Sequence, residues 1–384
     1  MSLRTPVRLV LMVAAGVCCL SGRPAAAQTF PCVDIPTPAA SLNLPRKYAP
    51  GRSQSEIDPA AAAIYAEGRE RLVATRTQLN RLTEQLLLGK GAPASRSNAR
   101  CLLTTLDRFA RAGSLLGQMS PQAKDLRMFF LPSAATAFIA ARQIERSPLQ
   151  EARIEAWLAR MSADSVRREN KRALIGNSPT HPHQINNHFY WTGYGALLVG
   201  IATHDDDAFA WGAQAIARGL DEVDDEGFLA PEVARDSRAL SYHALALQPL
   251  AMGVLLLREG GQSLSPRQMG ALRRLGGRTT EGVLDPSAFA EQMARRNGGR
   301  VIPQVEVPKT PPAIPLLMSM FGSSPSLTAV DARVRCYPNG PLGPSVGVWI
   351  GRTPALEGFE GRRRGGARLQ RLAFPPTGYK VCVR

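Results

Sequence analysis

The chain has 384 residues, and its 47 lysines and arginines against 31 aspartates and glutamates give a formal net charge of +16. This balance favours a polyanionic partner such as an acidic polysaccharide, an anionic surface or nucleic acid, but an arginine-rich surface without such a partner explains it equally well. No segment after residue 27 is expected to be apolar enough to cross a membrane, which argues against a membrane protein.

The first 27 residues have the pattern of a secretory signal peptide. Arg4 and Arg8 supply the positive start, and residues 9–20 form an apolar stretch too short to span a bilayer comfortably. The three alanines at 25–27 are the small residues of a cleavage site. We therefore expect cleavage near Ala27 and a periplasmic or secreted protein.

Four cysteines follow this leader, namely Cys32, Cys101, Cys336 and Cys382. An even number in an oxidising compartment favours disulfides over metal or catalytic roles. No pair has the Cys-x-x-Cys spacing of a zinc site, so we expect no metal. The residues alone leave all three pairings of the four cysteines open.

Periodicity is helical through most of residues 58–297. Apolar residues recur there at three- and four-residue spacing, without the alternation typical of strands. The predicted helices are 60–88, 101–116, 126–144, 148–166, 187–201, 208–220, 237–257 and 266–283. Helices of this length joined by short loops indicate an all-α fold of antiparallel hairpins, either a bundle or a curved α/α toroid.

The sequence changes character towards the C-terminus. Residues 305–315 are rich in proline, and helical periodicity vanishes from about Ser326. Residues 326–384 hold ten basic and three acidic residues, and 346–350 and 379–383 read as short strands. We therefore expect a catalytic domain at 28–325 and a short non-helical basic extension at 326–384. The extension is either a small disulfide-stapled module, which we favour, or a loosely ordered polyanion-binding arm.

Two polar runs stand out in the helical region, residues 186–191 and 235–243. Amide, imidazole, phenol and guanidinium groups are costly to bury and are not needed to form a helix, so their density requires another reason. If the second run is helical, Arg235, Arg238 and Tyr242 share one face, and an arginine beside a tyrosine stabilises the phenolate. Taken alone, such a stripe is more often a set of surface side chains.

The first run supplies complementary groups. Asn187 offers hydrogen-bond donors to a carboxylate, and His188 titrates near neutrality and can act as a base. The aromatic faces of Tyr190 and Trp191 suit the apolar faces of sugar rings. A histidine among aromatics is more often a core residue, but a catalyst that acts on an acidic sugar needs both runs together.

The two runs, with residues 223–229 between them and 238–250 at their end, resemble the alginate lyases of polysaccharide lyase family 5. Order and spacing agree over about 65 residues, and weaker similarity extends from Cys32 to about Phe321 and includes Arg46, Lys47 and Tyr48. The resemblance implies an α/α toroid with its active site in a groove. It also implies β-elimination without a metal or a cofactor.

The resemblance further implies roles for individual residues. Asn187 and Arg235 would neutralise the uronate carboxylate, which makes the C5 proton acidic. His188 would be the base or a further neutralising group, depending on the face from which the proton leaves. Tyr242 would protonate the 4-O leaving oxygen, and with mannuronate it could act as both base and acid.

Other positions are expected to contact substrate or to form disulfides. Lys47 and Tyr48 match a lysine–tyrosine pair near a mobile lid in the family. The expected substrate contacts are Lys47, Tyr48, Tyr190, Trp191 and Arg238. Cys32 and Cys101 fall where the family has pairable cysteines, which leaves Cys336 with Cys382. The basic tail has no match in the family. The segment between Tyr48 and Glu56, where the family has its lid, is poor in acids. More positive charge near the groove could shift the substrate preference towards polyglucuronate.

The sequence thus predicts an exported monomeric polyuronate lyase that acts on mannuronate-rich alginate and binds no nucleic acid. One alternative is a hydrolase that pairs Asp224 or Asp225 with Glu232, although these acids read more naturally as loop and helix-cap residues. Another is a non-catalytic polyanion-binding protein of the cell envelope. His181 and His183 look metal-like but lie in a turn without acidic or thiol neighbours.

Overall fold

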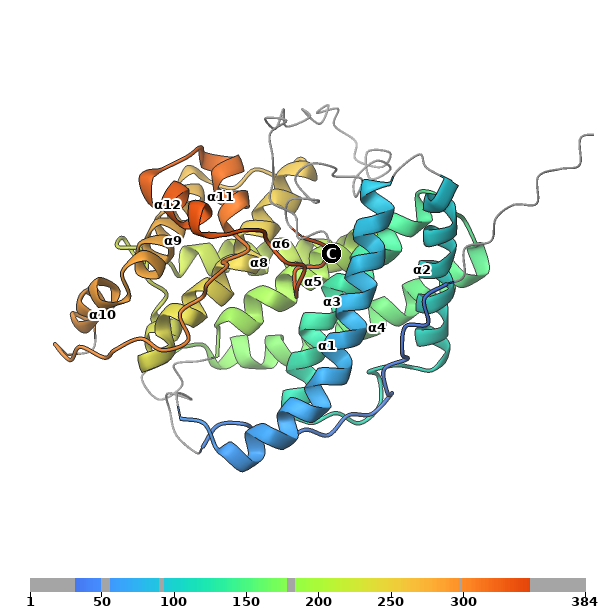
Figure 1. Ribbon diagram of the computed structural model, residues 1–384, viewed down its shortest axis with the longest axis horizontal. Helices are drawn as coiled ribbons and strands as arrows, with labels where there is room; N and C mark the ends of the chain where they lie inside the picture. Colours follow the sequence, from blue (N-terminus) through green and yellow to red (C-terminus); the bar gives the residue numbers. More distant parts are fainter. Residues whose placement is uncertain (1–31, 50–55, 90–92, 178–183, 297, 346–384) are drawn as a thin grey trace, which may run out of the picture. The chain divides into compact units, whose positions relative to one another are not determined.

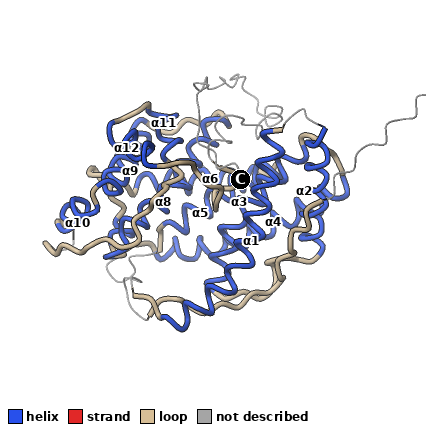
Figure 2. The backbone as a smooth tube through the Cα atoms, in the orientation of Figure 1, coloured by secondary structure: helices blue, strands red, loops and turns tan. Residues whose placement is uncertain are grey.

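The structure is a computed structural model, and it describes residues 32–49, 56–89, 93–177, 184–296 and 298–345. These residues form helices joined by loops, and no strand occurs among them (Figures 1 and 2). The helices are α1 (Pro59–Leu88), α2 (Pro93–Arg111), α3 (Pro121–Arg142), α4 (Pro148–Ile175), α5 (Asn187–Thr203), α6 (Asp206–Asp221), α7 (Ala230–Val233), the 3-10 helix η1 (Asp236–Arg238), α8 (Ala239–Glu259), α9 (Pro266–Leu284), α10 (Pro286–Ala294), α11 (Ile314–Phe321) and α12 (Pro325–Arg333).

Helix starts follow from capping residues in the sequence. Asp58 accepts a hydrogen bond from the Ala61 amide at the start of α1, and Ser265 with Gln268 forms a capping box at the start of α9. Proline occupies the first turn of most of the helices, where its missing N–H costs no hydrogen bond. All eight helices predicted from periodicity are present.

Helix α5 lies at the centre of the packing. It contacts α3, α4, α6 and α8, and its side chains are buried on every side. A helix that is apolar all round belongs in a core, and this burial fixes the position of its N-terminal residues, Asn187 and His188. Close contact with α6 depends on glycine, because a Cβ atom on Gly212 would lie 2.7 Å from the Gly193 carbonyl oxygen.

The segment after Ser326 departs from the sequence prediction. Residues 325–333 form α12, which the Ser324 side chain caps and which packs on α9 through Leu327 and Val330. The expectation of non-helical structure from Ser326 is therefore wrong for these residues, because a helix of nine residues with two buried positions is too short to show periodicity.

Residues 334–345 also join the helical core. Tyr337 and Leu342 are buried, and the Tyr194 hydroxyl in α5 donates a hydrogen bond to the Leu342 carbonyl oxygen at 2.8 Å. The residues from 346 onwards, with both predicted strands and most of the basic tail, lie outside the described residues, as does the predicted signal peptide. The proposed boundary at residue 325 stays a prediction.

One disulfide joins two segments of the described chain, with Cys32 and Cys101 bonded and their Cα atoms 5.4 Å apart. This confirms the first predicted pair. Cys336 is also disulfide-bonded, and Cys382, its expected partner, lies outside the described residues.

One helical stretch is long and apolar enough to cross a membrane by length and composition, namely Asp236–Glu259. The expectation that no segment would meet this criterion is therefore wrong. However, 78% of its most apolar window is buried inside the protein, as is usual for the core helix of a folded domain.

Candidate active site

Segments far apart in the sequence meet around one cavity of about 260 Å³. The segment before α1 contributes Lys47 and Tyr48, the start of α5 contributes His188, the turn before η1 contributes Arg235, and α8 contributes Tyr242. Five of the site residues predicted from the sequence therefore line the same cavity.

The centre of this site is a pair of tyrosines. The hydroxyl oxygens of Tyr48 and Tyr242 lie 3.0 Å apart and share a hydrogen bond. The Arg235 guanidinium lies 4.8 Å from the centre of the Tyr242 ring, and the Arg238 guanidinium lies 5.3 Å from the Tyr48 ring and 6.0 Å from the Tyr242 ring. Burial raises the pKa of Tyr242, the nearby Tyr48 raises it further, and the two arginines oppose the rise.

Arg235, Arg238 and Tyr242 come together without forming one helix. Arg235 lies in the turn after α7, Arg238 ends η1, and Tyr242 belongs to α8. Asp236 has φ of 52°, in the left-handed region that interrupts a helix. The expected single helical face is therefore wrong in its backbone, although all three side chains gather around the tyrosine pair.

A buried carboxylate holds the two groups expected to neutralise a substrate carboxylate. Glu232 Oε1 accepts hydrogen bonds from the backbone amide of Asn187 at 2.8 Å and from its Nδ2 at 3.0 Å. Glu232 Oε2 lies 3.6 Å from Arg235 Nε. Burial raises the pKa of Glu232, whereas Arg235 and Asn187 oppose this rise.

Asn187 and Arg235 differ in their access to the cavity. Asn187 is fully buried and does not line the cavity, whereas Arg235 lines it. Arg235 Nη1 and Asn187 Oδ1 are buried without a hydrogen-bond partner among the described residues. A buried guanidinium N–H without a partner costs free energy. An anionic group that enters the cavity could accept a hydrogen bond from it and remove this cost.

His188 faces an acidic neighbour that the sequence did not indicate. Its Nδ1 lies 3.5 Å from Asp125 Oδ1, and the same carboxylate oxygen is bonded by Arg168. Burial lowers the pKa of His188 to about 3, although Asp125 acts in the opposite direction. The imidazole is therefore uncharged at neutral pH, with one N–H and one nitrogen whose lone pair is free.

Other lining residues were missed from the sequence. Tyr65, Arg69 and Arg76 reach the cavity from α1, and their spacing of four and seven residues places them on one helix face. Arg76 is largely buried, which lowers its pKa to about 10 and leaves it cationic at neutral pH. That spacing is a signal in the sequence, but it is equally typical of a solvent-exposed face.

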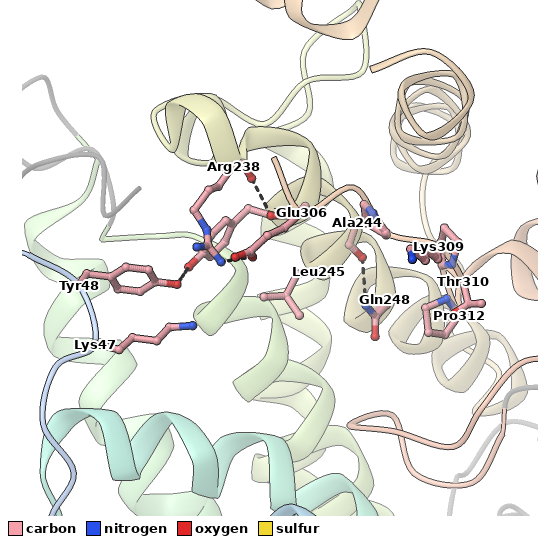
Figure 3. A pocket seen from close by; sticks show the side chains of 14 residues that line it. Lys47, Tyr48, Arg238, Ala244, Leu245, Gln248, Glu306, Lys309, Thr310 and Pro312 are labelled. Atoms are coloured by element: carbon pink, nitrogen blue, oxygen red, sulfur yellow. Dashed lines mark hydrogen bonds and ion pairs between the residues drawn. The ribbon is translucent and has the colours of Figure 1, made fainter. Parts of the chain in front are cut away.

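Figure 3 shows a second cavity, of about 350 Å³, which shares part of its lining with the first. Lys47, Tyr48, Tyr242 and Leu245 line both cavities, so the tyrosine pair belongs to a wall that the two share. Arg238 lines the second cavity, together with Glu306 and Lys309 from the segment that follows α10.

Tyr190 and Trp191 are not placed at either cavity. Both side chains are fully buried, and Trp191 Nε1 donates a hydrogen bond to the Leu245 carbonyl oxygen at 3.1 Å. The expectation that these two side chains contact the sugar is therefore wrong, because neither has any exposed surface that a polysaccharide could touch.

The acids of the alternative hydrolase have structural partners. Asp224 Oδ1 accepts hydrogen bonds from the amides of Glu226 and Phe228, each at 2.9 Å, and its other oxygen pairs with Arg296. Glu232 is buried against Asn187 and Arg235, so these acids do not form a catalytic pair. His181 and His183 lie outside the described residues. Within those residues, no group of three or more histidines, cysteines, aspartates or glutamates could hold a metal.

Comparisons with known proteins agree with this arrangement. A family model described as alginate lyase matches residues 43–289. A polysaccharide lyase from Stenotrophomonas maltophilia (strain K279a) is 32% identical over 269 residues, which cover 69% of this chain and 77% of that protein. An alginate lyase from Pseudomonas syringae pv. syringae (strain B728a) is 33% identical over 272 residues, 68% of each chain.

Among solved structures, alginate lyase A1-III from Sphingomonas species A1 is similar with a TM-score of 0.56 at 20% identity, over 79% of this chain and 82% of that one. A histidine-to-alanine variant of alginate lyase A1-III in complex with a tetrasaccharide gives a TM-score of 0.58, also at 20% identity, over 79% and 81% of the two chains. This likeness shows that the fold is an α/α toroid, which confirms the fold expected from the sequence.

Proposed function

The chain belongs to the alginate lyase family, and from this premise we propose that it cleaves the 4-O-glycosidic bond of alginate by β-elimination, with a preference for mannuronate. The observation that carries the proposal is the tyrosine pair with its two guanidiniums, in one cavity with an unprotonated histidine. An elimination needs a group for the carboxylate, a base and an acid, and this cavity offers all three.

In the first step, Arg235 binds the uronate carboxylate. Its unpartnered Nη1 can donate to a carboxylate oxygen, and Asn187 lies behind it, held by the same Glu232. Neutralising the carboxylate makes the C5 proton more acidic and stabilises the enolate-like intermediate that forms when the proton leaves. Glu232 positions both groups and does not itself touch the substrate.

The second step moves the C5 proton and releases O4. In mannuronate the proton and the leaving oxygen lie on the same face of the ring, so Tyr242 can remove the proton and then donate one to O4. Arg235 and Arg238 stabilise the phenolate that this step requires, against the burial that raises the pKa of Tyr242. On this assignment His188 is not needed as the base, and as a neutral imidazole it can donate a hydrogen bond to the carboxylate but adds no positive charge.

Guluronate presents the proton on the opposite face, and there His188 would accept it. Its lowered pKa leaves the imidazole free to do so at neutral pH. Asp125 Oδ1 lies 3.5 Å from His188 Nδ1, which has no hydrogen-bond partner among the described residues. We propose that Asp125 is a positioning residue for this side chain: on closer approach it would accept a hydrogen bond from Nδ1–H, keep the proton there and leave the Nε2 lone pair as the acceptor.

Turnover tests the proposal directly. Elimination yields an unsaturated, ultraviolet-absorbing end, so absorbance is followed on polymannuronate, polyguluronate and polyglucuronate. We expect the fastest rise on polymannuronate and near-complete loss of activity in Tyr242→Phe and His188→Ala. Lys171→Gln, an exposed substitution on α4 that lines neither cavity, is the control.

Other outcomes separate the alternatives. A new reducing end without ultraviolet absorbance would indicate hydrolysis, and binding without turnover would indicate a polyanion-binding protein. Faster turnover of polyglucuronate would transfer the preference to that polymer. Full activity in both variants would overturn the assigned roles.

We also propose export to the periplasm or the medium. The disulfide between Cys32 and Cys101 supports it, since disulfides persist in oxidising compartments. Cell fractionation, with mass spectrometry of the mature N-terminus, tests cleavage near Ala27. Intact protein with residue 1 in the cytoplasmic fraction would refute it.

A further inference from the structure

The second cavity extends the site beyond the tyrosine pair. Tyr48 and Tyr242 form part of the wall between the two cavities, and Lys47 and Leu245 line both. A polymer whose reacting bond lies at the Tyr242 hydroxyl would therefore place one sugar on each side of this wall. The second cavity has a volume of about 350 Å³, larger than the first.

The segment that contributes Glu306 and Lys309 to this cavity is held by hydrogen bonds to the start of α8 and the turn before it. Gln304 Oε1 accepts a hydrogen bond from the Leu240 amide at 2.9 Å, and Gln304 Nε2 donates to the Asp236 carbonyl oxygen at 3.1 Å. The Val305 amide donates to the Ser237 carbonyl oxygen at 2.7 Å. We call residues 304–312 the proline-rich strap, and these bonds hold its first residues against the turn that carries Arg238.

Within the strap, Glu306 forms an ion pair with Arg238 (Figure 3). The Arg238 side chain is only 7% exposed and already has this carboxylate as its partner, although the Glu306 side chain is itself 51% exposed. A substrate carboxylate would therefore have to compete with Glu306 for Arg238. The guanidinium still lies beside the rings of Tyr48 and Tyr242.

Two other cations in the second cavity have no acidic partner. Neither Lys47 nor Lys309 takes part in an ion pair among the described residues, and they lie at opposite ends of the cavity (Figure 3). Pro308, Pro311 and Pro312 surround Lys309 in sequence and also line the cavity. Prolines restrict the backbone, so the strap presents this ammonium group at a low cost in conformational entropy.

We propose that the second cavity binds a neighbouring uronate residue of the polymer and that Lys309 binds its carboxylate. This inference rests on the proposed function, because it assumes that the polymer reacts at Tyr242. It adds a recognition residue that lies outside residues 43–289, the part of the chain that the family model matches.

The test compares Lys309→Gln with Lys309→Arg and with Lys171→Gln, which removes the same charge from an exposed position on α4. Initial rates on polymannuronate at low salt give KM and kcat. We expect Lys309→Gln to raise KM about threefold to tenfold with kcat nearly unchanged, because one partly exposed charge contact is lost. Lys309→Arg should restore most of the affinity, and Lys171→Gln should behave as the unsubstituted protein does.

Calorimetric binding of a mannuronate oligomer separates this inference from the proposed function. It is measured with Tyr242→Phe and with Tyr242→Phe combined with Lys309→Gln. Turnover by the unsubstituted protein with KM and Kd unaffected by Lys309→Gln would overturn the subsite and leave the lyase intact. Binding that depends on Lys309 without any unsaturated product would support the subsite and overturn the lyase. Neither binding nor turnover would overturn both.

Discussion

The hydroxyl groups of Tyr48 and Tyr242 lie 3.0 Å apart although 194 positions separate the two residues in the chain. One comes from an irregular segment before the first helix and the other from a buried core helix. The Tyr242 hydroxyl, which we propose as the reacting group, is thus held by contact between the two segments, and this contact can be tested by substitution.

Replacing Tyr48 by phenylalanine removes this hydrogen bond and keeps the ring. We expect kcat to fall about tenfold, less than the 10²- to 10⁴-fold loss expected for Tyr242→Phe, because Tyr48 only orients the reacting group. Since Tyr48 raises the pKa of Tyr242, its loss should also lower that pKa. The mechanism requires the phenolate, so the limb on which kcat rises with pH should shift to lower pH. A profile identical to that of the unsubstituted protein would contradict this role.

Asp125→Asn tests the positioning of His188. We expect kcat to fall at least about tenfold with KM little changed, because the imidazole loses the carboxylate that we propose sets its tautomer. Nitrogen-15 NMR of the histidine ring reports the tautomer directly. Asp164→Asn is the matched control, since Asp164 also pairs with a buried arginine, Arg127, and lines neither cavity. An unchanged tautomer in Asp125→Asn would remove Asp125 from the mechanism.

Glu232→Gln should damage both stability and turnover. Removing the charge leaves Arg235 buried and uncompensated, which we expect to cost about 3–5 kcal/mol in the free energy of unfolding. Turnover should fall further than the unfolded fraction explains, because Asn187 and Arg235 lose their common support. Glu84→Gln is the control: this buried carboxylate accepts a hydrogen bond from the Ser345 amide and lines neither cavity. It should lower stability while the folded protein keeps its kcat.

Acid should destabilise the protein through two histidines, His243, which is fully buried, and His188, which is partly buried. Burial lowers the pKa of His188 to about 3 and that of His243 to about 4, whereas both lie near 6.5 in an unfolded chain. Below pH 6.5 the unfolded chain binds protons that the folded protein does not, so stability falls by up to about 1.4 kcal/mol per pH unit for each histidine. Above pH 6.5 both forms are neutral and this contribution disappears.

His243→Gln isolates one of these contributions. The His243 Nε2 atom accepts a hydrogen bond from the Leu229 amide, and Nδ1 faces the Ala239 carbonyl oxygen, so the variant will lose some stability at every pH. The informative quantity is the difference in urea midpoint between pH 7 and pH 4.5. It should shrink in His243→Gln, and an undiminished difference would show that other groups cause the acid sensitivity.

The sequence predicted the helices well because periodicity is a property of long amphipathic or buried segments. It also predicted His188, Arg235 and Tyr242 as site residues, since several polar groups within two short runs of an apolar region need a reason, and the structure places all three at one cavity. For aromatic residues the sequence could not separate a core position from a binding position, because a tryptophan such as Trp191 is equally suited to packing in a core and to lining a groove. Only the three-dimensional packing placed it in the core.

Single polar residues were beyond this kind of reasoning. Asp125 lies on a helix where one more acid is indistinguishable from a solvent-exposed residue, and its importance comes from the distance to His188. Glu306 and Lys309 lie in a segment without periodicity, so nothing in the sequence relates them to residues about 70 and 260 positions earlier, Arg238 and Lys47.

The proline-rich strap lies outside residues 43–289, the range that matches the family. One wall of the site thus lies within the matched range and the other lies outside it. If Lys309 binds the neighbouring uronate as we propose, substitutions in the strap change the affinity for a polymer without altering the residues around His188. Proteins that share the matched range would then catalyse the same reaction and differ in the polymer that they prefer.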